Sequence, residues 1–186
     1  MPMRAFGTER LWVRPLGTGD QALYCRLYTH HDVMKHVGQP LTYEAARAGF
    51  AHVCRSNEQG DFLHRCWVIS ERGTGLEAGI VAVTRHGEKA EFGMLLLPQW
   101  QAKGIGKEVV PLLMDYVFRT SEISEMFNCH RLENTGVVRV MQALQFEAME
   151  TTARGEGWGG WRRTRSQWSA ARNRPHPDKP TTNSVA

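Results

Sequence analysis

Long hydrophobic runs are missing from this sequence, since it contains no stretch of about 18 consecutive apolar residues. That absence excludes a membrane-spanning helix. The first residues also lack the apolar segment of a secretory signal, so we expect a cytoplasmic protein without a membrane partner. Cysteines are few and scattered, at Cys25, Cys54, Cys66 and Cys129. This spacing excludes a zinc or redox site built from close cysteine pairs and favours buried, reduced thiols, and we expect no metal.

Length and composition fit a single compact domain. A chain of 186 residues has no room for a second full domain. Its 41% hydrophobic and 23% charged residues exclude a fully disordered or fibrous chain. We expect residues 1–169 to form the domain and residues 170–186, rich in Pro, Asn and Arg, to form a disordered basic and polar tail.

The positive charge is concentrated near the C-terminus. Residues 151–186 hold seven Lys and Arg against two Asp and Glu, within a net charge of +4. Nucleic-acid binding is one explanation, and it would use Arg162, Arg163, Arg165, Arg172 and Arg174. A solvated strand edge followed by a loose tail explains the same charge more simply, so we do not expect a nucleic-acid partner.

The order of hydrophobic patterns predicts an α/β fold. A strand is followed by two helices, three antiparallel strands, a helix, a strand, a helix and two strands. The expected strands cover 9–15, 66–70, 78–84, 90–97, 126–132, 146–152 and 161–168, and the helices begin near residues 20, 42, 105 and 137. Pro111 lies inside the third helix, where a proline removes one backbone hydrogen bond.

A glycine-rich turn, residues 101–106, joins the third of the three antiparallel strands to the next helix. Gly104 and Gly106 allow the backbone to approach a ligand, and the first N–H groups of a helix lack partners inside the helix. Lys103 and Lys107 add positive charge, so the turn suits a pyrophosphate. A P-loop and a dinucleotide-binding loop are excluded, because the residues that define them are absent.

The segment from Ala90 to Pro98 with the following Gln101-x-x-Gly104-x-Gly106 closely resembles the acyl-CoA signature of the GCN5-related N-acetyltransferases (GNAT). Asn134, the helix after it and Phe146 resemble a later motif of that family. Residues 32–34, Pro40 and residues 42–45 resemble the opening of its ribosomal-protein N-terminal acetyltransferase (RimJ/RimL-like) branch. The resemblance covers residues 8–169.

Three positions depart from the family pattern. Val137 replaces a serine and Gln145 replaces a glycine. Met141 stands where many relatives carry the tyrosine that protonates the leaving thiolate. The resemblance therefore implies the family but does not identify a general acid.

The resemblance implies a GNAT-like fold with a mixed, mostly antiparallel sheet of about seven strands, flanked by four helices and splayed at the cofactor site. It implies acetyl-CoA as the co-substrate, with its pantetheine arm paired to backbone groups near Leu95 and Leu97. The Leu95 N–H would donate to the thioester carbonyl. The residues expected to bind the cofactor are Leu95, Leu96, Leu97, Gln101, Ala102, Lys103, Gly104, Ile105, Gly106, Lys107 and Asn134.

The implied reaction moves an acetyl group directly to a primary amine within a ternary complex. The amine must be neutral to attack, and an N-terminal α-amine, with a pKa of about 7.7 to 8.0, needs less help than an alkyl amine at about 10.4. Glu91 is our candidate general base, since it lies four residues before Leu95 and so on the same side of a strand. The alternative for Glu91 is a strand-edge glutamate in a salt bridge.

Several other residues have two interpretations. Trp158 and Trp161 either shape the acceptor pocket or cover a sheet edge. Asn134 either contacts the cofactor or caps the helix that follows it. Cys129 is expected to be a core thiol rather than a nucleophile.

An acetyltransferase acting on a small-molecule amine or a protein N-terminus is the leading hypothesis. A catalytically weak module that binds acyl-CoA or another protein is the alternative, because the tyrosine is missing and the base is uncertain. The sequence leaves a monomer and a homodimer equally open.

Overall fold

The computed structural model describes residues 3–59, 62–151 and 154–172. Its strands are β1 (Phe6–Gly7), β2 (Leu11–Pro15), β3 (His64–Glu71), β4 (Glu77–His86), β5 (Lys89–Leu96), β6 (Glu125–Arg131), β7 (Glu147–Met149) and β8 (Trp158–Thr164). Its helices are α1 (Gln21–Thr29), α2 (His31–Met34), α3 (Tyr43–Gln59), α4 (Ile105–Thr120), α5 (Thr135–Ala143) and α6 (Arg165–Arg172).

All eight strands join one sheet in the order β1-β2-β3-β4-β5-β6-β8-β7. Every neighbouring pair is antiparallel except β5 and β6, which run parallel because the α4 crossover lies between them. The mixed, mostly antiparallel α/β fold expected from the sequence is confirmed.

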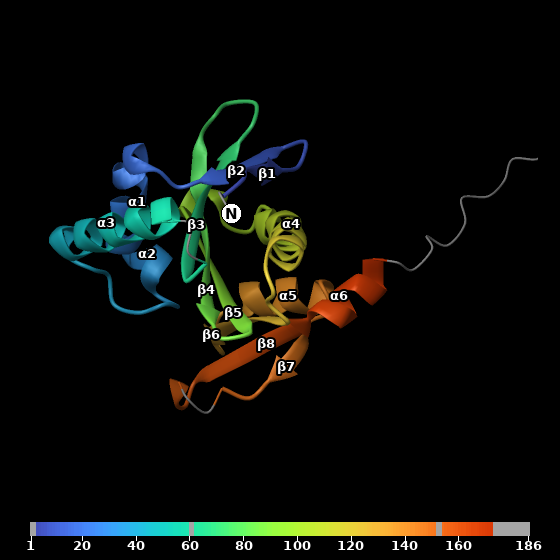
Figure 1. Ribbon diagram of the computed structural model, residues 1–186. Coiled ribbons are helices and arrows are strands. Elements are labelled where there is room, and N and C mark those ends of the chain that lie inside the picture. The colour runs from blue at the N-terminus through green and yellow to red at the C-terminus, as the bar shows by residue number, and fades with distance from the viewer. Residues whose placement is uncertain (1–2, 60–61, 152–153, 173–186) are drawn as a thin grey trace, which may run out of the picture.

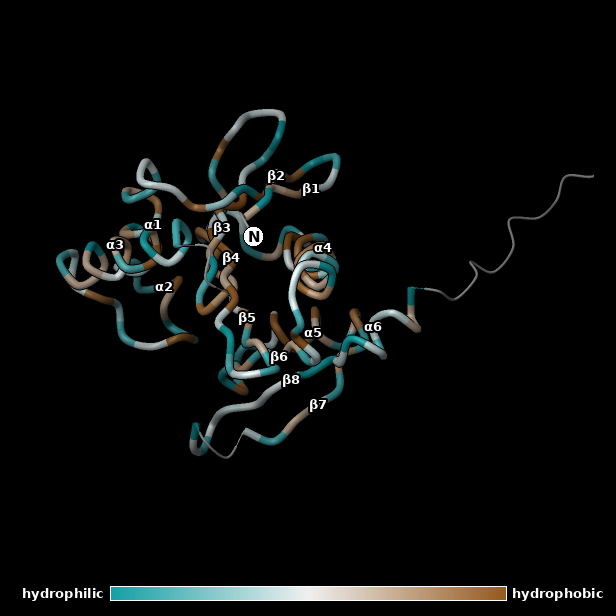
Figure 2. The backbone as a smooth tube through the Cα atoms, viewed as in Figure 1, coloured by the Kyte–Doolittle hydropathy of each residue, from teal (hydrophilic) through white to brown (hydrophobic). Residues whose placement is uncertain are grey.

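Helices cover both faces of the sheet, with α1, α2 and α3 on one face and α4 and α5 on the other (Figure 1). Successive side chains of β3 point to opposite faces, so Trp67 meets Tyr116 of α4 with ring centroids 5.4 Å apart, while Val68 turns the other way. Both residues are fully buried, which explains why β3 is a continuous apolar run. Figure 2 shows hydrophobic residues along the central strands and along α4.

Helix α4 leads away from the glycine-rich turn and anchors it to the core. Ile105, Val109 and Leu113 are each at most 1% exposed. The helix continues through Pro111, as the sequence pattern predicted, although the proline offers no N–H to the preceding turn. The buried stripe therefore fixes where the helix begins.

The C-terminal end differs from our prediction. We expected a strand over residues 161–168, but β8 ends at Thr164 and α6 follows. The change comes from a reciprocal cap, in which the Gln167 N–H donates to Thr164 Oγ1 at 3.3 Å and the Thr164 N–H donates to Gln167 Oε1 at 2.9 Å. Helix α6 also takes in residues 170–172, which we had assigned to the tail. The rest of the expected tail lies outside the described residues.

Short elements account for the other differences. The two-residue strand β1 brings the sheet to eight strands rather than about seven. The four-residue helix α2 and helix α6 bring the described helices to six rather than four. Elements as short as β1 and α2, with two and four residues, carry too little periodicity to be read from a sequence.

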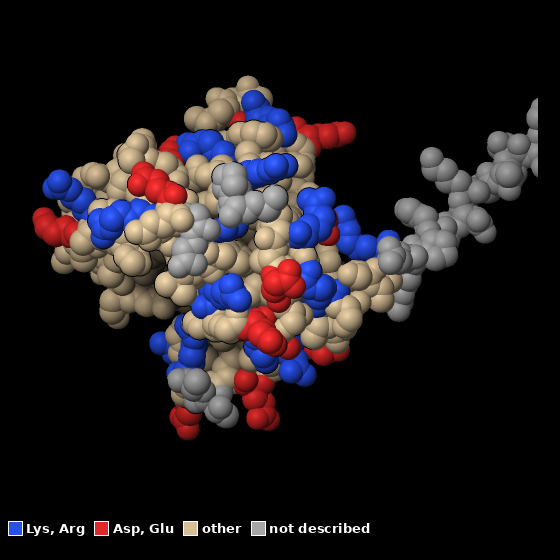
Figure 3. Space-filling view, viewed as in Figure 1, with Lys and Arg blue, Asp and Glu red and all other residues tan. Residues whose placement is uncertain are grey.

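Arginines near the C-terminus of the described chain form contacts with other residues of the same protein. Arg172 Nη2 lies 2.6 Å from Asp115 Oδ2, and Arg165 Nη2 donates to the Ser121 carbonyl at 2.7 Å. Arg162 lies within 3.9 Å of both Glu125 and Glu147. Figure 3 shows Lys and Arg interspersed with Asp and Glu on the visible face. These contacts favour a structural role for the basic region over nucleic-acid binding; Arg174 lies outside the described residues.

Candidate functional site

Strands β5 and β6 pair over three positions and then part. The register is Lys89↔Glu125, Ala90↔Met126 and Glu91↔Phe127. At the next position a side chain replaces the backbone, because Asn128 Nδ2 donates a 2.9 Å hydrogen bond to the Phe92 carbonyl. Residues 93–96 of β5 and 129–131 of β6 then flank an interruption of the ladder, which we call the splay. A strand edge left free in this way can pair with an extended ligand.

Backbone alternation decides which residues of β5 face the splay. In an antiparallel pair, the N–H and C=O groups of every second residue point at the partner strand. The Leu97 N–H donates to the Ala78 carbonyl at 2.9 Å, on the β4 side. The Phe92 carbonyl instead accepts from Asn128, on the β6 side. Residues 92, 94 and 96 therefore turn their backbone groups toward the splay.

This alternation corrects one predicted contact and shifts another by one residue. We expected Leu95 and Leu97 to present backbone groups to a ligand, but the Leu97 N–H is already bound to Ala78. Alternation assigns the free edge to Met94 and Leu96 instead, and the Leu96 carbonyl accepts from Gln101 Nε2 at 3.0 Å. The Gln101 side chain therefore ties the turn to the end of β5.

The glycine-rich turn has the backbone shape that the sequence suggested. A 3-10 turn (Pro98–Trp100) precedes it, Ala102 has φ 58° and Gly104 has φ 77°. Gly104 is the N-cap of α4 and has no side chain to satisfy the first N–H groups of the helix. A Cβ on Gly104 would meet no described atom within 4 Å, so the left-handed backbone rather than lack of space requires glycine there.

Most of the backbone N–H groups that the sequence predicted as pyrophosphate donors still lack a partner within the helix at the N-terminus of α4. The N–H groups of Ile105 and Gly106 belong to the first turn, where helix geometry provides no partner four residues earlier. The Lys107 N–H is an exception, because it donates to the Gly104 carbonyl at 3.0 Å. The exposed side chains of Lys103 and Lys107 leave this end of the helix positive.

Arg10, just before β2, braces the turn from outside. Its Nη2 donates to the Lys103 carbonyl at 3.0 Å and also binds the Glu108 carboxylate. Thr8 Oγ1 donates to the same carboxylate at 3.0 Å. Glu108 lies in the first turn of α4, and these contacts pair its carboxylate within the protein.

Helix α5 packs close to the turn from the β6 side. A Cβ on Gly106 would come within 3.3 Å of Val140, so this glycine permits the two helices to approach. Asn134 caps α5, since its Oδ1 accepts from the Val137 N–H at 3.3 Å. The capping interpretation of Asn134 is confirmed, and a contact of its Nδ2 with a ligand stays a prediction. Met141 is 3% exposed and has no proton to donate.

Glu91 lies at the last paired position before the splay, on the face covered by α1 to α3. Both of its carboxylate oxygens accept from Arg154 Nη2, each at 2.7 Å. Arg154 comes from the connection between β7 and β8, 63 residues later. The salt-bridge interpretation of Glu91 is therefore confirmed, and a role as base stays a prediction that requires Arg154 to move.

Gly93 follows Glu91 on the same face and is exposed, which is unusual in the middle of a central strand. A Cβ there would meet no described atom within 4 Å. The Glu91–Arg154 pair lies two residues earlier on this face. The face opposite α4 is thus accessible at the splay.

Cys129 lies across the splay from Gly93. Burial, and then the nearby Glu91 carboxylate, raise the pKa of the Cys129 thiol, while Arg154 lowers it by a smaller amount. A thiol with a raised pKa is a poor nucleophile at neutral pH, which favours the core-thiol interpretation.

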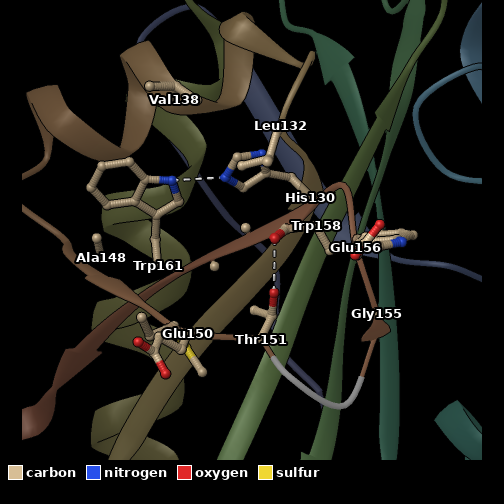
Figure 4. A pocket seen from close by; sticks show the side chains of 13 residues that line it. His130, Leu132, Val138, Ala148, Glu150, Thr151, Gly155, Glu156, Trp158 and Trp161 are labelled. Atoms are coloured by element: carbon tan, nitrogen blue, oxygen red, sulfur yellow. Dashed lines mark hydrogen bonds between the residues drawn. The ribbon is translucent and has the colours of Figure 1, made fainter.

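Trp158 and Trp161 line the same hollow of about 530 Å³ but have different partners (Figure 4). Trp161 Nε1 donates to His130 Nε2 at 2.9 Å, beneath α5. Trp158 receives the guanidinium groups of Arg131 and Arg154, at 4.6 and 5.1 Å from its ring centroid. Being three residues apart in one strand, the two rings point to opposite faces, so only Trp158 adjoins the Glu91–Arg154 pair.

A GNAT acetyltransferase domain family matches residues 10–147. The chain belongs to this family. The GNAT match runs from β2 to the first residue of β7 and thus includes the turn, the splay and Glu91. In the described residues no three His, Cys, Asp or Glu side chains cluster as metal ligands, and no helix is long and apolar enough to cross a bilayer.

Solved structures share this GNAT fold at low sequence identity. The spermidine N-acetyltransferase of Vibrio cholerae, in complex with CoA and spermine, superposes with a TM-score of 0.73 at 17% identity, covering 87% of this chain and 99% of that one. RimL, a ribosomal L7/L12 α-N-protein acetyltransferase in complex with CoA, gives 0.73 at 15%, covering 86% and 96%. The ribosomal-protein-S5-alanine acetyltransferase of Vibrio fischeri gives 0.71 at 15%, covering 89% and 99%.

Sequence reasoning missed three residues of this GNAT site. Arg10 and Arg154 reach the site from distant segments of the chain, and no local sequence pattern predicts such contacts. Asn128 did carry a signal, because a polar residue inside a buried strand needs a partner.

Proposed function

We propose that this GNAT domain transfers the acetyl group of acetyl-CoA directly to a primary amine within a ternary complex. The observation that carries the proposal is the free edge of β5 leading into the N-terminus of α4 at Gly104. An extended arm ending in a pyrophosphate matches that sequence of features. When bound, acetyl-CoA supplies an activated acetyl thioester.

The turn would hold the pyrophosphate. The N–H groups from Ala102 to Gly106 lie at the positive end of the α4 dipole, and Lys103 and Lys107 add two charges. Arg10 keeps the backbone of the turn in place through the Lys103 carbonyl. Asn134 Nδ2 is a further donor on the α5 side.

The free edge of β5 would hold the pantetheine arm. Alternation favours the backbone groups of Met94 and the N–H of Leu96 over those of Leu95 and Leu97. The Met94 N–H, the first donor beyond Phe92, also replaces Leu95 as our candidate to stabilise the charge that develops on the thioester oxygen.

The amine acceptor would approach at Gly93, on the face of the sheet that α1 to α3 cover. Glu91 lies two residues before Gly93 on the same face of β5, and we propose that it accepts the proton that the amine loses on attack. Arg154 must first leave Glu91, since it occupies both carboxylate oxygens. Trp158 would shape the amine side of the site through its contact with Arg154, whereas Trp161 would act only as support for His130.

The charges near Glu91 favour an α-amine over a polyamine. Arg131 and Arg154 both lie on Trp158, and their guanidinium groups would repel a ligand with several positive charges. An N-terminal α-amine is also partly neutral near pH 7, with a pKa of about 7.7 to 8.0. The four cysteines are unpaired, which fits the reducing cytoplasm as the location of this reaction.

A two-part experiment tests the proposal. Calorimetric titration with acetyl-CoA should give a single site, and thiol release should then depend on an added peptide with a free N-terminus. The same peptide with an acetylated N-terminus is the control and should give only background release. Binding without turnover on any peptide or small amine would instead support an acyl-CoA-binding module, and absence of binding would exclude both.

A further inference from the structure

Asn128 is a buried amide with half of its hydrogen-bonding capacity unused. The residue is 9% exposed, and its Nδ2 donates to the Phe92 carbonyl at 2.9 Å. Its Oδ1 is buried and has no hydrogen-bond partner among the described residues. An unsatisfied buried acceptor costs about 1 to 3 kcal/mol, so such an atom calls for a ligand or an ordered water.

The position of Asn128 in the sheet indicates which ligand can reach it. It is the first residue of β6 beyond the last pair, Glu91↔Phe127, and it bridges to β5 where the splay begins. Any extended ligand that adds to the free edge of β5 therefore ends beside the Asn128 side chain. The atom nearest that end must be a hydrogen-bond donor, because Oδ1 can only accept.

The chemistry of the pantetheine arm provides one such donor near its reactive end. A thioester has no N–H or O–H group, but the amide nearest the sulfur carries one N–H. The acceptor amine is the competing donor, yet Glu91 and Gly93 open toward the face of α1 to α3. Asn128 has the opposite parity to Phe127, which neighbours Glu91, so its side chain does not belong to that face.

We propose that Asn128 positions the co-substrate, with Oδ1 accepting a hydrogen bond from the pantetheine amide N–H nearest the thioester. The proposal rests on the proposed function. The same side chain would hold β5 through Phe92 and the arm through Oδ1, and so fix the arm relative to the strand edge. Asn128 is a positioning residue in this scheme and takes no part in bond making.

The test pairs Asn128→Leu, which has nearly the same shape, with an acetyl-CoA analogue whose amide nearest the sulfur is replaced by an ester. The ester keeps the length of the arm and removes the N–H. Calorimetry should show wild-type protein binding the ester analogue about five- to tenfold more weakly than acetyl-CoA, in line with one lost hydrogen bond. Asn128→Leu should bind both ligands with equal affinity, at the weaker level.

Adenosine 3′,5′-bisphosphate serves as the matched control ligand, because it has the nucleotide end and lacks the arm. Its affinity should be the same in both proteins. An ester penalty that is equal in both proteins, or absent from the wild type, overturns the role of Asn128, and an ordered water then satisfies Oδ1. Wild-type protein that binds neither nucleotide ligand contradicts the proposed function itself. If Asn128→Leu does not fold, Asn128→Ala takes its place in the same comparison, and absence of an ester penalty in the wild type overturns the role of Asn128 without any variant.

Discussion

The Arg154 guanidinium donates to both carboxylate oxygens of Glu91, each at 2.7 Å, and so ties the β7–β8 connection to the central strand β5. The contact pairs the carboxylate that we propose as the general base with a residue that lies outside the strands of the sheet.

Arg154→Gln should lower the KM for the amine acceptor, because the incoming amine no longer has to displace the Arg154 guanidinium from Glu91. The Kd for acetyl-CoA should stay the same. Steady-state kinetics at saturating acetyl-CoA measures the first quantity and calorimetry the second. Arg162→Gln is the matched control: it removes the same charge from the neighbouring strand β8, where Arg162 pairs with Glu125 and Glu147. A raised KM in Arg154→Gln alone would mean that Arg154 binds the acceptor.

Glu91→Gln should remove the pH dependence that a carboxylate base gives to kcat/KM. A base acts only when deprotonated, so the wild-type kcat/KM should rise with pH on the acid side of its profile. The variant should lack that rise and should be about 10²- to 10⁴-fold slower at the plateau of the wild-type profile. Normal rates of Glu91→Gln at every pH would end the proposal for this residue.

Gly104→Glu should abolish acetyl-CoA binding, because the side chain would add negative charge at the proposed pyrophosphate site and would strain a residue at φ 77°. Gly87→Glu is the control. It also has a positive φ, 64°, with no described atom within 4 Å of its Cβ, but it lies in the β4–β5 hairpin. Calorimetry should give wild-type affinity for the Gly87 variant, and retained affinity in Gly104→Glu would exclude the turn.

Asp20→Asn should destabilise the fold in a pH-dependent way. Asp20 is 6% exposed and makes two hydrogen bonds with Arg14, at 2.7 and 2.8 Å, and one with the Gly17 N–H. Burial raises the pKa of this carboxyl, but the bonds from Arg14 and Gly17 outweigh it and leave the pKa below its ordinary value. A lowered pKa contributes stability that is complete above the ordinary value of about 3.9 and is lost as pH falls through the folded value.

Urea unfolding should therefore show Asp20→Asn less stable than wild type by about 1 to 3 kcal/mol at pH 7. The difference should shrink as the pH falls from about 4 toward the lowered pKa of the folded protein, because the carboxyl takes up its proton first in the unfolded state. A difference that stays constant from pH 7 to pH 3 would assign the loss to hydrogen-bond geometry rather than to charge.

The order of elements and the glycine-rich turn could be predicted because each depends on local patterns. The apolar run of β3, the stripe of α4 and Gly104 all act within a few residues of themselves. Helix α6 was also encoded locally, by the reciprocal cap of Thr164 and Gln167, which the expected strand over residues 161–168 did not take into account.

The contacts that complete the site could not be predicted. Arg10 meets Lys103, and Arg154 meets Glu91, only after the sheet has brought distant segments together. The side of β5 that faces the splay also depends on the register with β4, and an error of one residue moves it to Leu95 and Leu97.

The short parallel pairing of β5 and β6 has a mechanical consequence. Three residue pairs and the hydrogen bond from the Asn128 side chain to the Phe92 carbonyl join β5 to β6, and the Ser124 N–H donates to the Glu88 carbonyl at 2.8 Å just before them. Slow breathing of the molecule should start along this line, with amide hydrogens of β6 exchanging before those of β3 and β4. A ligand that pairs with the strand edge in the splay would connect β5 and β6 and suppress that motion.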